Sequence, residues 1–267
     1  MKYIFFTILI LISINVFSQN VGQKGDTLKN YKDINGLKQG YWEKPYKNGR
    51  IAYKAYFVND KLVGDYFRYY SNGKQMLKIK YDKNQSGYAT LYWDNGKKMA
   101  EGKYVNVNVK DSIWKFYGID GVLMATESYK NGIRDGLAQS FYRNKKVSEE
   151  IGWKNGKKNG IWRKYYDNGQ TRMETRYVNN EMDGIFHVFY QNGRMYIDGG
   201  YKADLKHGVW NFYDKKGKLE KTIEYINGIA TNQDELDSIQ DAQIREWESQ
   251  KGKFKEPDVN RFYNPQR

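Results

Sequence analysis

The chain has no cysteine, three prolines and two histidines among its 267 residues. The absence of cysteine excludes disulfides and thiolate chemistry. His187 and His207 occupy different places in the sequence pattern, and no closely spaced group of histidines and carboxylates accompanies them. A transition-metal site is therefore not expected, and the sequence predicts no cofactor.

No arrangement of catalytic residues stands out either. Asp94, Asp167 and Asp214 lie in predicted turns, where aspartate is favoured because its side chain bonds to nearby backbone. A glycosidase pair would need two carboxyl groups about 5 to 9.5 Å apart in a cleft, and the sequence singles out no such pair. The glycine motifs are not phosphate loops, because no helix is predicted after them. We predict that the chain is not an enzyme.

Long apolar runs are missing except at the N-terminus. Lys2 precedes an apolar run over residues 3–17, and the small residue Ser18 follows it. This pattern is typical of a cleaved secretory signal, because the run is somewhat short for a spanning helix. The sequence predicts cleavage after Ser18 and an exported protein, periplasmic or extracellular; an uncleaved membrane anchor is the alternative. Loss of Lys2 would change the formal net charge from +14 to +13.

Glycine, in contrast, recurs at regular intervals of 23 to 25 residues, with Ser112 taking its place once. Repetition at this period indicates stacked supersecondary units instead of a single globular core. We number these units 1 to 8, and position n is the nth residue after the opening residue of a unit. The opening residues are Gly40, Gly64, Gly87, Ser112, Gly136, Gly160, Gly184 and Gly208.

Each unit has the sequence of a β-hairpin. In unit 6, an aromatic-rich run over residues 160–166 leads through Asn168 and Gly169 into a second run over residues 171–177. An Asn-Gly pair between two such runs is the strongest short-range hairpin signal. A second turn signal closes each unit, and position 17 is aromatic in all eight. We predict an all-β fold, an elongated, twisted single-layer antiparallel sheet of about eight stacked hairpins and sixteen strands.

These repeats resemble the bacterial variant of the MORN repeat family, whose units carry a Gly-x-Trp-x-x-Tyr-Tyr-x-Asn-Gly-Lys half followed by a Tyr-x-Asn-Gly-x-x-x-Gly half. The resemblance covers residues 31–228. It departs at Ser112 and Asp120 in unit 4, at Lys145 in place of the turn glycine of unit 5, and at Lys216 in place of the turn asparagine of unit 8. The resemblance implies an elongated antiparallel sheet used as a scaffold or binding surface. Many bacterial members carry an antitoxin label by similarity.

The hairpin register assigns side chains to two faces. If Asn and Gly are the two central turn residues, positions 2, 4 and 6 pair with positions 15, 13 and 11. The expected packed face then holds positions 2, 6 and 17. Its members are Trp42, Tyr66, Trp114, Trp162, Phe186 and Trp210; Tyr46, Tyr70, Trp93, Tyr142, Tyr166 and Tyr190; and Phe57, Tyr81, Tyr104, Tyr129, Trp153, Tyr177, Tyr201 and Tyr225.

The opposite face, which we call the second face, carries an aromatic residue at position 5 among charged neighbours. Such rings can stack on planar groups and the neighbouring cations can attract anions, so we predict a binding surface there. The alternative is that these rings form cross-strand pairs that only hold the hairpins together. We call these seven residues the aromatic ladder: Tyr69, Tyr92, Tyr117, Phe141, Tyr165, Phe189 and Tyr213.

Outside the repeats, residues 19–39 form an N-terminal segment with a partial repeat, residues 40–228 form the array, and residues 229–267 form the C-terminal part. In this last part Leu236, Ile239, Ile244 and Trp247 fall on one helical face, with acidic residues first and lysines later, as the helix dipole favours. We expect an α-helix that covers the last hairpin, because a repeat array needs its open edge protected.

The sequence favours a non-enzymatic, exported repeat scaffold that binds a protein partner along the aromatic ladder. One alternative is that the basic charge binds anionic membrane lipid or polysaccharide of the envelope, and another is that this charge only solvates the surface. Nucleic acid is a third class of ligand, but export argues against that encounter. The antitoxin role implied by the resemblance requires a cytosolic toxin, which the predicted leader also argues against.

Overall fold

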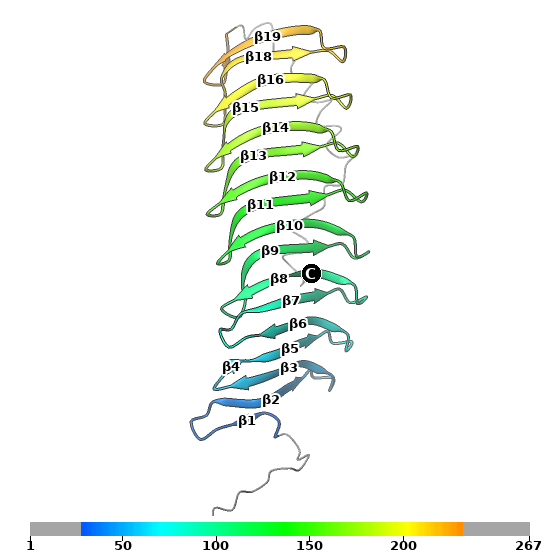
Figure 1. The fold of residues 1–267 in the computed structure, drawn as a ribbon, viewed down its shortest axis with the longest axis vertical. Helices are drawn as coiled ribbons and strands as arrows, with labels where there is room; N and C mark the ends of the chain where they lie inside the picture. The colour runs from blue at the N-terminus through cyan, green and yellow to red at the C-terminus, as the bar shows by residue number, and fades with distance from the viewer. Residues whose placement is uncertain (1–27, 232–267) are drawn as a thin grey trace, which may run out of the picture.

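The structure is a computed structural model that describes residues 28–231. These residues form one antiparallel sheet of 20 strands, stacked as a single column along the long axis of the molecule (Figure 1). The prediction of an elongated, single-layer, all-β array is confirmed. The predicted signal peptide and the predicted C-terminal helix lie outside the described residues. Within residues 28–231 no helix is long and apolar enough to cross a membrane.

Sixteen of the described strands have six to nine residues, and the other four have two residues each. The longer ones correspond to the sixteen predicted strands. The bounds are β1 Tyr31–Lys32, β2 Lys38–Pro45, β3 Ile51–Val58, β4 Lys61–Leu62, β5 Gly64–Tyr69, β6 Gln75–Tyr81, β7 Gly87–Tyr92, β8 Lys98–Val105, β9 Val109–Tyr117, β10 Leu123–Lys130, β11 Ile133–Phe141, β12 Val147–Lys154, β13 Lys157–Tyr165, β14 Thr171–Val178, β15 Glu181–Phe189, β16 Met195–Lys202, β17 Leu205–Lys206, β18 Gly208–Tyr213, β19 Leu219–Ile226 and β20 Ile229–Ala230.

The turn inside each unit differs from the predicted two-residue turn. In unit 6, the Tyr166 N–H donates to the Gln170 carbonyl at 2.8 Å, and the Gly169 N–H donates to the Tyr166 carbonyl at 2.8 Å. Gly169 has φ +92°, whereas Asn168 is not in the left-handed region. This is a three-residue loop in which a type I turn precedes a glycine bulge, and its Asn side chain accepts a hydrogen bond from the Gln170 N–H. The predicted pairing of position 6 with position 11 is therefore wrong.

The two-residue turn with mirror-image geometry occurs instead between units. Asn155 and Gly156 have φ +49° and +77° between the paired residues Lys154 and Lys157. Positive φ at both central residues defines the type I′ turn, whose twist matches that of its strands. The chain thus uses the same Asn-Gly pair in two turns, distinguished by loop length.

Away from the turns, the predicted register is correct. In unit 6, Trp162 pairs with Thr175 and Lys164 pairs with Met173, which are the predicted pairings of position 2 with 15 and of 4 with 13. The side chains on this face are buried most deeply, with Trp114 and Trp210 only 1% and 2% exposed. The packed face is therefore where the sequence predicted it.

Small residues let the largest rings lie flat on the sheet. A Cβ atom at Gly102 would be 2.4 Å from the indole of Trp114, and a Cβ atom at Gly199 would be 2.4 Å from the indole of Trp210. In each case the glycine belongs to the strand beside that of the tryptophan. The rings therefore bridge neighbouring hairpins, as a one-layer array requires.

The rings at position 6, predicted for the packed face, also join units through hydrogen bonds at the edge where the hairpins turn. Each donates from its side chain to the position-5 carbonyl of the next unit, at 2.6 to 3.2 Å. Among the seven junctions between the described units, only that between units 4 and 5 lacks this bond, because Gly118 occupies position 6. The donors are Tyr46, Tyr70, Trp93, Tyr142, Tyr166 and Tyr190.

Candidate binding surface

The aromatic ladder lies in one column of the second face. Each of its seven members is the last residue of its strand, in β5, β7, β9, β11, β13, β15 and β18. All seven are partly buried. In β5 the position-3 and position-5 side chains share this face, since the rings of Phe67 and Tyr69 are stacked with centroids 6.5 Å apart. The structure therefore places the predicted residues in one column, but their rings are partly buried instead of fully exposed.

Two ladder hydroxyls are engaged by carboxylates of the preceding unit. The Tyr117 hydroxyl donates to Glu101 at 2.6 Å, and the Tyr165 hydroxyl donates to Glu150 at 2.5 Å. The bond from Tyr117, with further support from Lys98, holds the pKa of Glu101 below its usual range. Burial, followed by the bond to Glu150, raises the pKa of Tyr165 to about 12. These rings therefore act first as parts of a cross-strand network.

A band of ion pairs runs beside the ladder at positions 3 and 14. Arg163 lies between Glu174, at 2.5 Å, and Glu150, at 3.4 Å. Glu174 is the main reason that the pKa of Arg163 is raised. Further along the column, His187 Nε2 lies 3.1 Å from Asp198 Oδ1. Positive and negative groups are thus interleaved and partly neutralised on this face.

A third band, which the sequence analysis did not single out, consists of exposed apolar residues at position 1. Six of the eight position-1 side chains are apolar or aromatic and between 37% and 64% exposed. The signal was present in the sequence, because an apolar residue directly follows most of the opening glycines. We call this set the apolar stripe: Tyr41, Tyr88, Ile113, Leu137, Ile185 and Val209.

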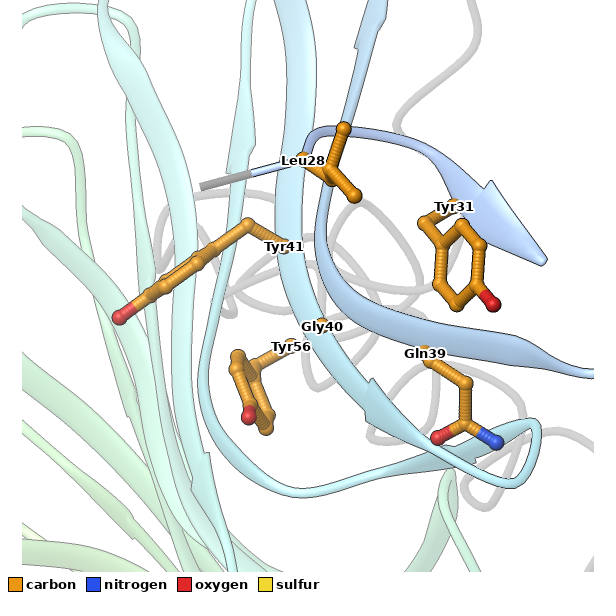
Figure 2. Close-up of a pocket in the computed structure, with 6 residues that line it drawn as sticks. All are labelled: Leu28, Tyr31, Gln39, Gly40, Tyr41 and Tyr56. Carbon is orange, nitrogen blue, oxygen red and sulfur yellow. The ribbon is translucent and has the colours of Figure 1, made fainter. Parts of the chain in front are cut away.

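The apolar stripe meets a shallow hollow at the N-terminal end of the column. Figure 2 shows the rings of Tyr31, Tyr41 and Tyr56 around this hollow, with Leu28 and Gln39 at its sides. Tyr41 and Tyr56 contact each other edge to face, with centroids 5.0 Å apart. The hollow is aromatic and uncharged, so it suits an apolar or aromatic group better than an anion.

Replacing Tyr117 with phenylalanine should raise the pKa of Glu101 toward its ordinary value, because the hydroxyl that favours the carboxylate is lost. With the folded-state pKa depressed, the contribution of Glu101 to stability is present above its unfolded pKa and disappears as pH falls through the folded pKa. The variant should therefore lose less stability on acidification. Carboxyl NMR titration and urea denaturation at neutral and acid pH measure both effects. An unchanged Glu101 titration would contradict this assignment.

Groups that could support catalysis are not concentrated anywhere on the described surface. Residues 28–231 contain no group of three or more histidines, aspartates or glutamates that could hold a metal ion. His187 lies within β15, and His207 lies between β17 and β18. On the described second face, the side chains form extended bands along the array.

Comparison with known proteins identifies the repeats. Residues 134–155, 158–179 and 206–227 match the MORN repeat variant. No curated protein matches the chain. Repeats of this family are non-catalytic and commonly form scaffolds that bind proteins or lipids.

Similarity to solved structures is confined to short parts of larger chains. A mutant of S. aureus TarM in complex with fondaparinux, alpha-GlcNAc-glycerol and UDP is 13% identical, with 36% of this chain covered and a TM-score of 0.28. Another TarM crystal structure is 13% identical, with 38% covered and a TM-score of 0.26. This chain spans about a fifth of the length of those chains, 19% and 20%.

Three matched segments coincide with units whose hairpins, turns and register continue on both sides of them from Gly40 to Gly228. The resemblance expected from the sequence is confirmed by these matches. Residues 134–155, 158–179 and 206–227 are therefore repeats of the MORN variant type, and the other units of the array share their hairpin architecture.

Proposed function

We propose that this chain is an exported, non-enzymatic scaffold that binds a protein partner along its second face. The observation that carries the proposal is the exposed apolar stripe, which recurs in six of the eight units, is interrupted by Asp65 in unit 2, and shares the second face with the aromatic ladder across the band of ion pairs. Exposed apolar side chains gathered on one face mark interaction sites more often than singly scattered ones do. Aromatic rings with polar tips beside such a band are typical of the centre of protein interfaces.

The charges on this face favour a protein over an anionic surface. Glu43 is paired with Lys29 and Lys54, and Glu101 is paired with Lys98 and Lys115. A surface that attracts lipid headgroups or acidic polysaccharide needs a surplus of cations, whereas interleaved charges can fix the register of a protein partner.

A second candidate, binding to anionic lipid or polysaccharide, is favoured by one edge of the array instead of by the face. Position 10, at the three-residue turns, is Lys or Arg in six of eight units. Several of these side chains also cap turn carbonyls of the next unit, as in the bond from Arg50 Nη1 to Ser71 O at 3.3 Å. The residues are Arg50, Lys74, Lys97, Lys146, Arg194 and Lys218. The antitoxin role is the less supported candidate, because an exported chain would not meet a cytosolic toxin.

The decisive variants are Ile113→Asp and Leu137→Asp on the apolar stripe. Asp65 occupies position 1 in unit 2, so the fold itself accommodates aspartate there. We expect partner capture from the envelope fraction to fall at least tenfold, about 1.4 kcal/mol, because a charge would be desolvated in the interface. Ile119→Asp is the matched control, since Ile119 is 62% exposed but lies in a turn.

Unchanged capture by both stripe variants would overturn the proposal for this face. Binding to vesicles with anionic lipid that disappears at high salt, and is lost on neutralising position 10, would support the second candidate instead.

A further inference from the structure

The packed face carries a line of lysines that follows its tryptophans. Four units have Trp at position 2, and all four have Lys exactly four residues earlier; none of the other four units has Lys at that place. Each of these ammonium groups lies over the indole of its tryptophan and over the position-17 ring of the same unit. In each pair the lysine Nζ lies 4.9 to 5.5 Å from the centroid of the indole; the pairs are Lys38 with Trp42, Lys110 with Trp114, Lys158 with Trp162 and Lys206 with Trp210.

Two of these lysines, in the C-terminal half of the array, contact aromatic rings but form no ion pair with a described carboxylate. Lys206 Nζ lies 4.9 Å from the Trp210 ring and 4.8 Å from the Tyr225 ring, and burial lowers its pKa. Lys158 lies 5.0 Å from the Tyr177 ring. Among the residues that the structure describes, no aspartate or glutamate forms an ion pair with either of them. A cation over aromatic rings is stabilised by them, yet a nearby carboxylate would add to that stabilisation.

The described chain ends in the last hairpin, next to the packed-face rings of unit 8. Ala230 is buried in the cluster that contains Trp210, Ile223 and Tyr225. The Thr231 N–H then donates to the Glu224 carbonyl at 3.0 Å, at the end of the column. The last described residues therefore lie beside the rings on which Lys206 lies.

The sequence that follows complements this surface in charge and in apolar content. Residues 232–250 contain six acidic residues and one basic residue, although the whole chain has a net charge of +14. Leu236, Ile239, Ile244 and Trp247 are spaced as on one face of a helix. We propose that residues 232–250 dock on the packed face, with their carboxylates at the line of lysines and their apolar side chains on the rings.

The length of the segment fits this placement. Lys206 and Lys158 are two units apart, which is four strands or about 19 Å at roughly 4.8 Å per strand. As a helix, the 19 residues of this segment would span about 29 Å. The segment can therefore cover both lysines, and the protein partner of the second face would be left undisturbed. This inference concerns the opposite face and does not depend on the proposed function.

The test uses the full chain, which is free of native cysteines, with two new cysteines at a time. The packed-face pair is Ser238→Cys with Ile197→Cys, and the control pair is Ser238→Cys with Asp198→Cys. Ile197 and Asp198 are neighbours in β16 that pair with Phe212 and Asn211, so they lie on opposite faces. A short bis-maleimide should join the packed-face pair within one chain at least tenfold faster than the control pair.

Three outcomes would overturn the proposal. Equal rates for both pairs would show no preference for a face. A product between chains would assign the face to a second copy. If neither product forms although both cysteines react with a monofunctional maleimide, residues 232–250 do not dock on the packed face.

A charge variant tests the role of the lysines separately. Lys206→Met is chosen because the array already accommodates methionine at this position: Met182 is the equivalent residue of unit 7. It should lower the rate for the packed-face pair several-fold, as should high salt. Lys202→Met, at an exposed lysine of β16, is the control and should change little. Equal rates for the two variants would contradict the electrostatic contact.

Discussion

Replacing Trp114 with alanine should lower the free energy of unfolding by about 3 to 5 kcal/mol, the range for truncating a buried tryptophan. Trp114 is among the largest fully buried side chains of the described array. Its indole lies on Gly102 and contacts Tyr104 and Phe116, with ring centroids 4.7 and 6.4 Å away. In a one-layer sheet no second layer of described strands can close over the cavity, so the lost contacts are not replaced.

Urea denaturation combined with hydrogen exchange measures this effect, because a repeat array can open locally. Exchange should accelerate most in β8, β9 and β10, whose residues surround the indole. Trp42→Ala is the comparison, since Trp42 is only partly buried in the first unit and should cost less. Equal losses for Trp114 and Trp42 would mean that the burial of Trp114 does not set its contribution.

Much of this fold could be predicted from the sequence because the same hairpin pattern occurs in eight units, so a departure in one unit does not hide it. The aromatic residue at position 17 and the turn signals fix the strand count even where unit 4 has Ser112 in place of glycine. Ser112 adopts φ +60° there, so the backbone conformation is retained despite the departure. The β period of two then places positions 2, 15 and 17 on one face without further information.

The turn type could not be predicted, because Asn-Gly suits both the two-residue turn and the glycine bulge of the three-residue loop. In unit 5 the bulge position is Lys145, which adopts φ +69°. The loop geometry is therefore set by the register of the surrounding strands, and glycine only makes it less costly.

The candidate surface was predicted in part for a similar reason. The position-5 column follows from alternation, but the engagement of Tyr117 and Tyr165 by glutamates of the preceding unit depends on contacts between strands of different hairpins. The burial of Glu127 was equally hidden, because position 15 is otherwise small, apolar or Thr and nothing in the pattern marks a carboxylate as buried.

That buried carboxylate leads to the second large effect. Replacing Arg134 with methionine should lower the free energy of unfolding by about 3 kcal/mol, the lower end of the range for breaking a buried ion pair. Glu127 is 5% exposed and accepts a hydrogen bond from Arg134 Nη2 at 2.7 Å and another from the Tyr129 hydroxyl. Without the guanidinium, the carboxylate stays buried with less compensation for its lost hydration.

The array supplies both halves of the control. Met182 replaces Arg134 at the equivalent position of unit 7, and Thr175 replaces Glu127 at position 15 of unit 6, so the double variant Glu127→Thr, Arg134→Met assembles two side chains that the fold already uses. It should regain much of the stability lost by Arg134→Met, because the buried carboxylate is removed together with its guanidinium partner, while Lys110 keeps its contacts with the rings of Trp114 and Tyr129. Arg134 also lies over the Trp153 ring, at 4.9 Å. If the double variant is as unstable as the single one in urea, the loss comes from that ring contact and not from the stranded carboxylate.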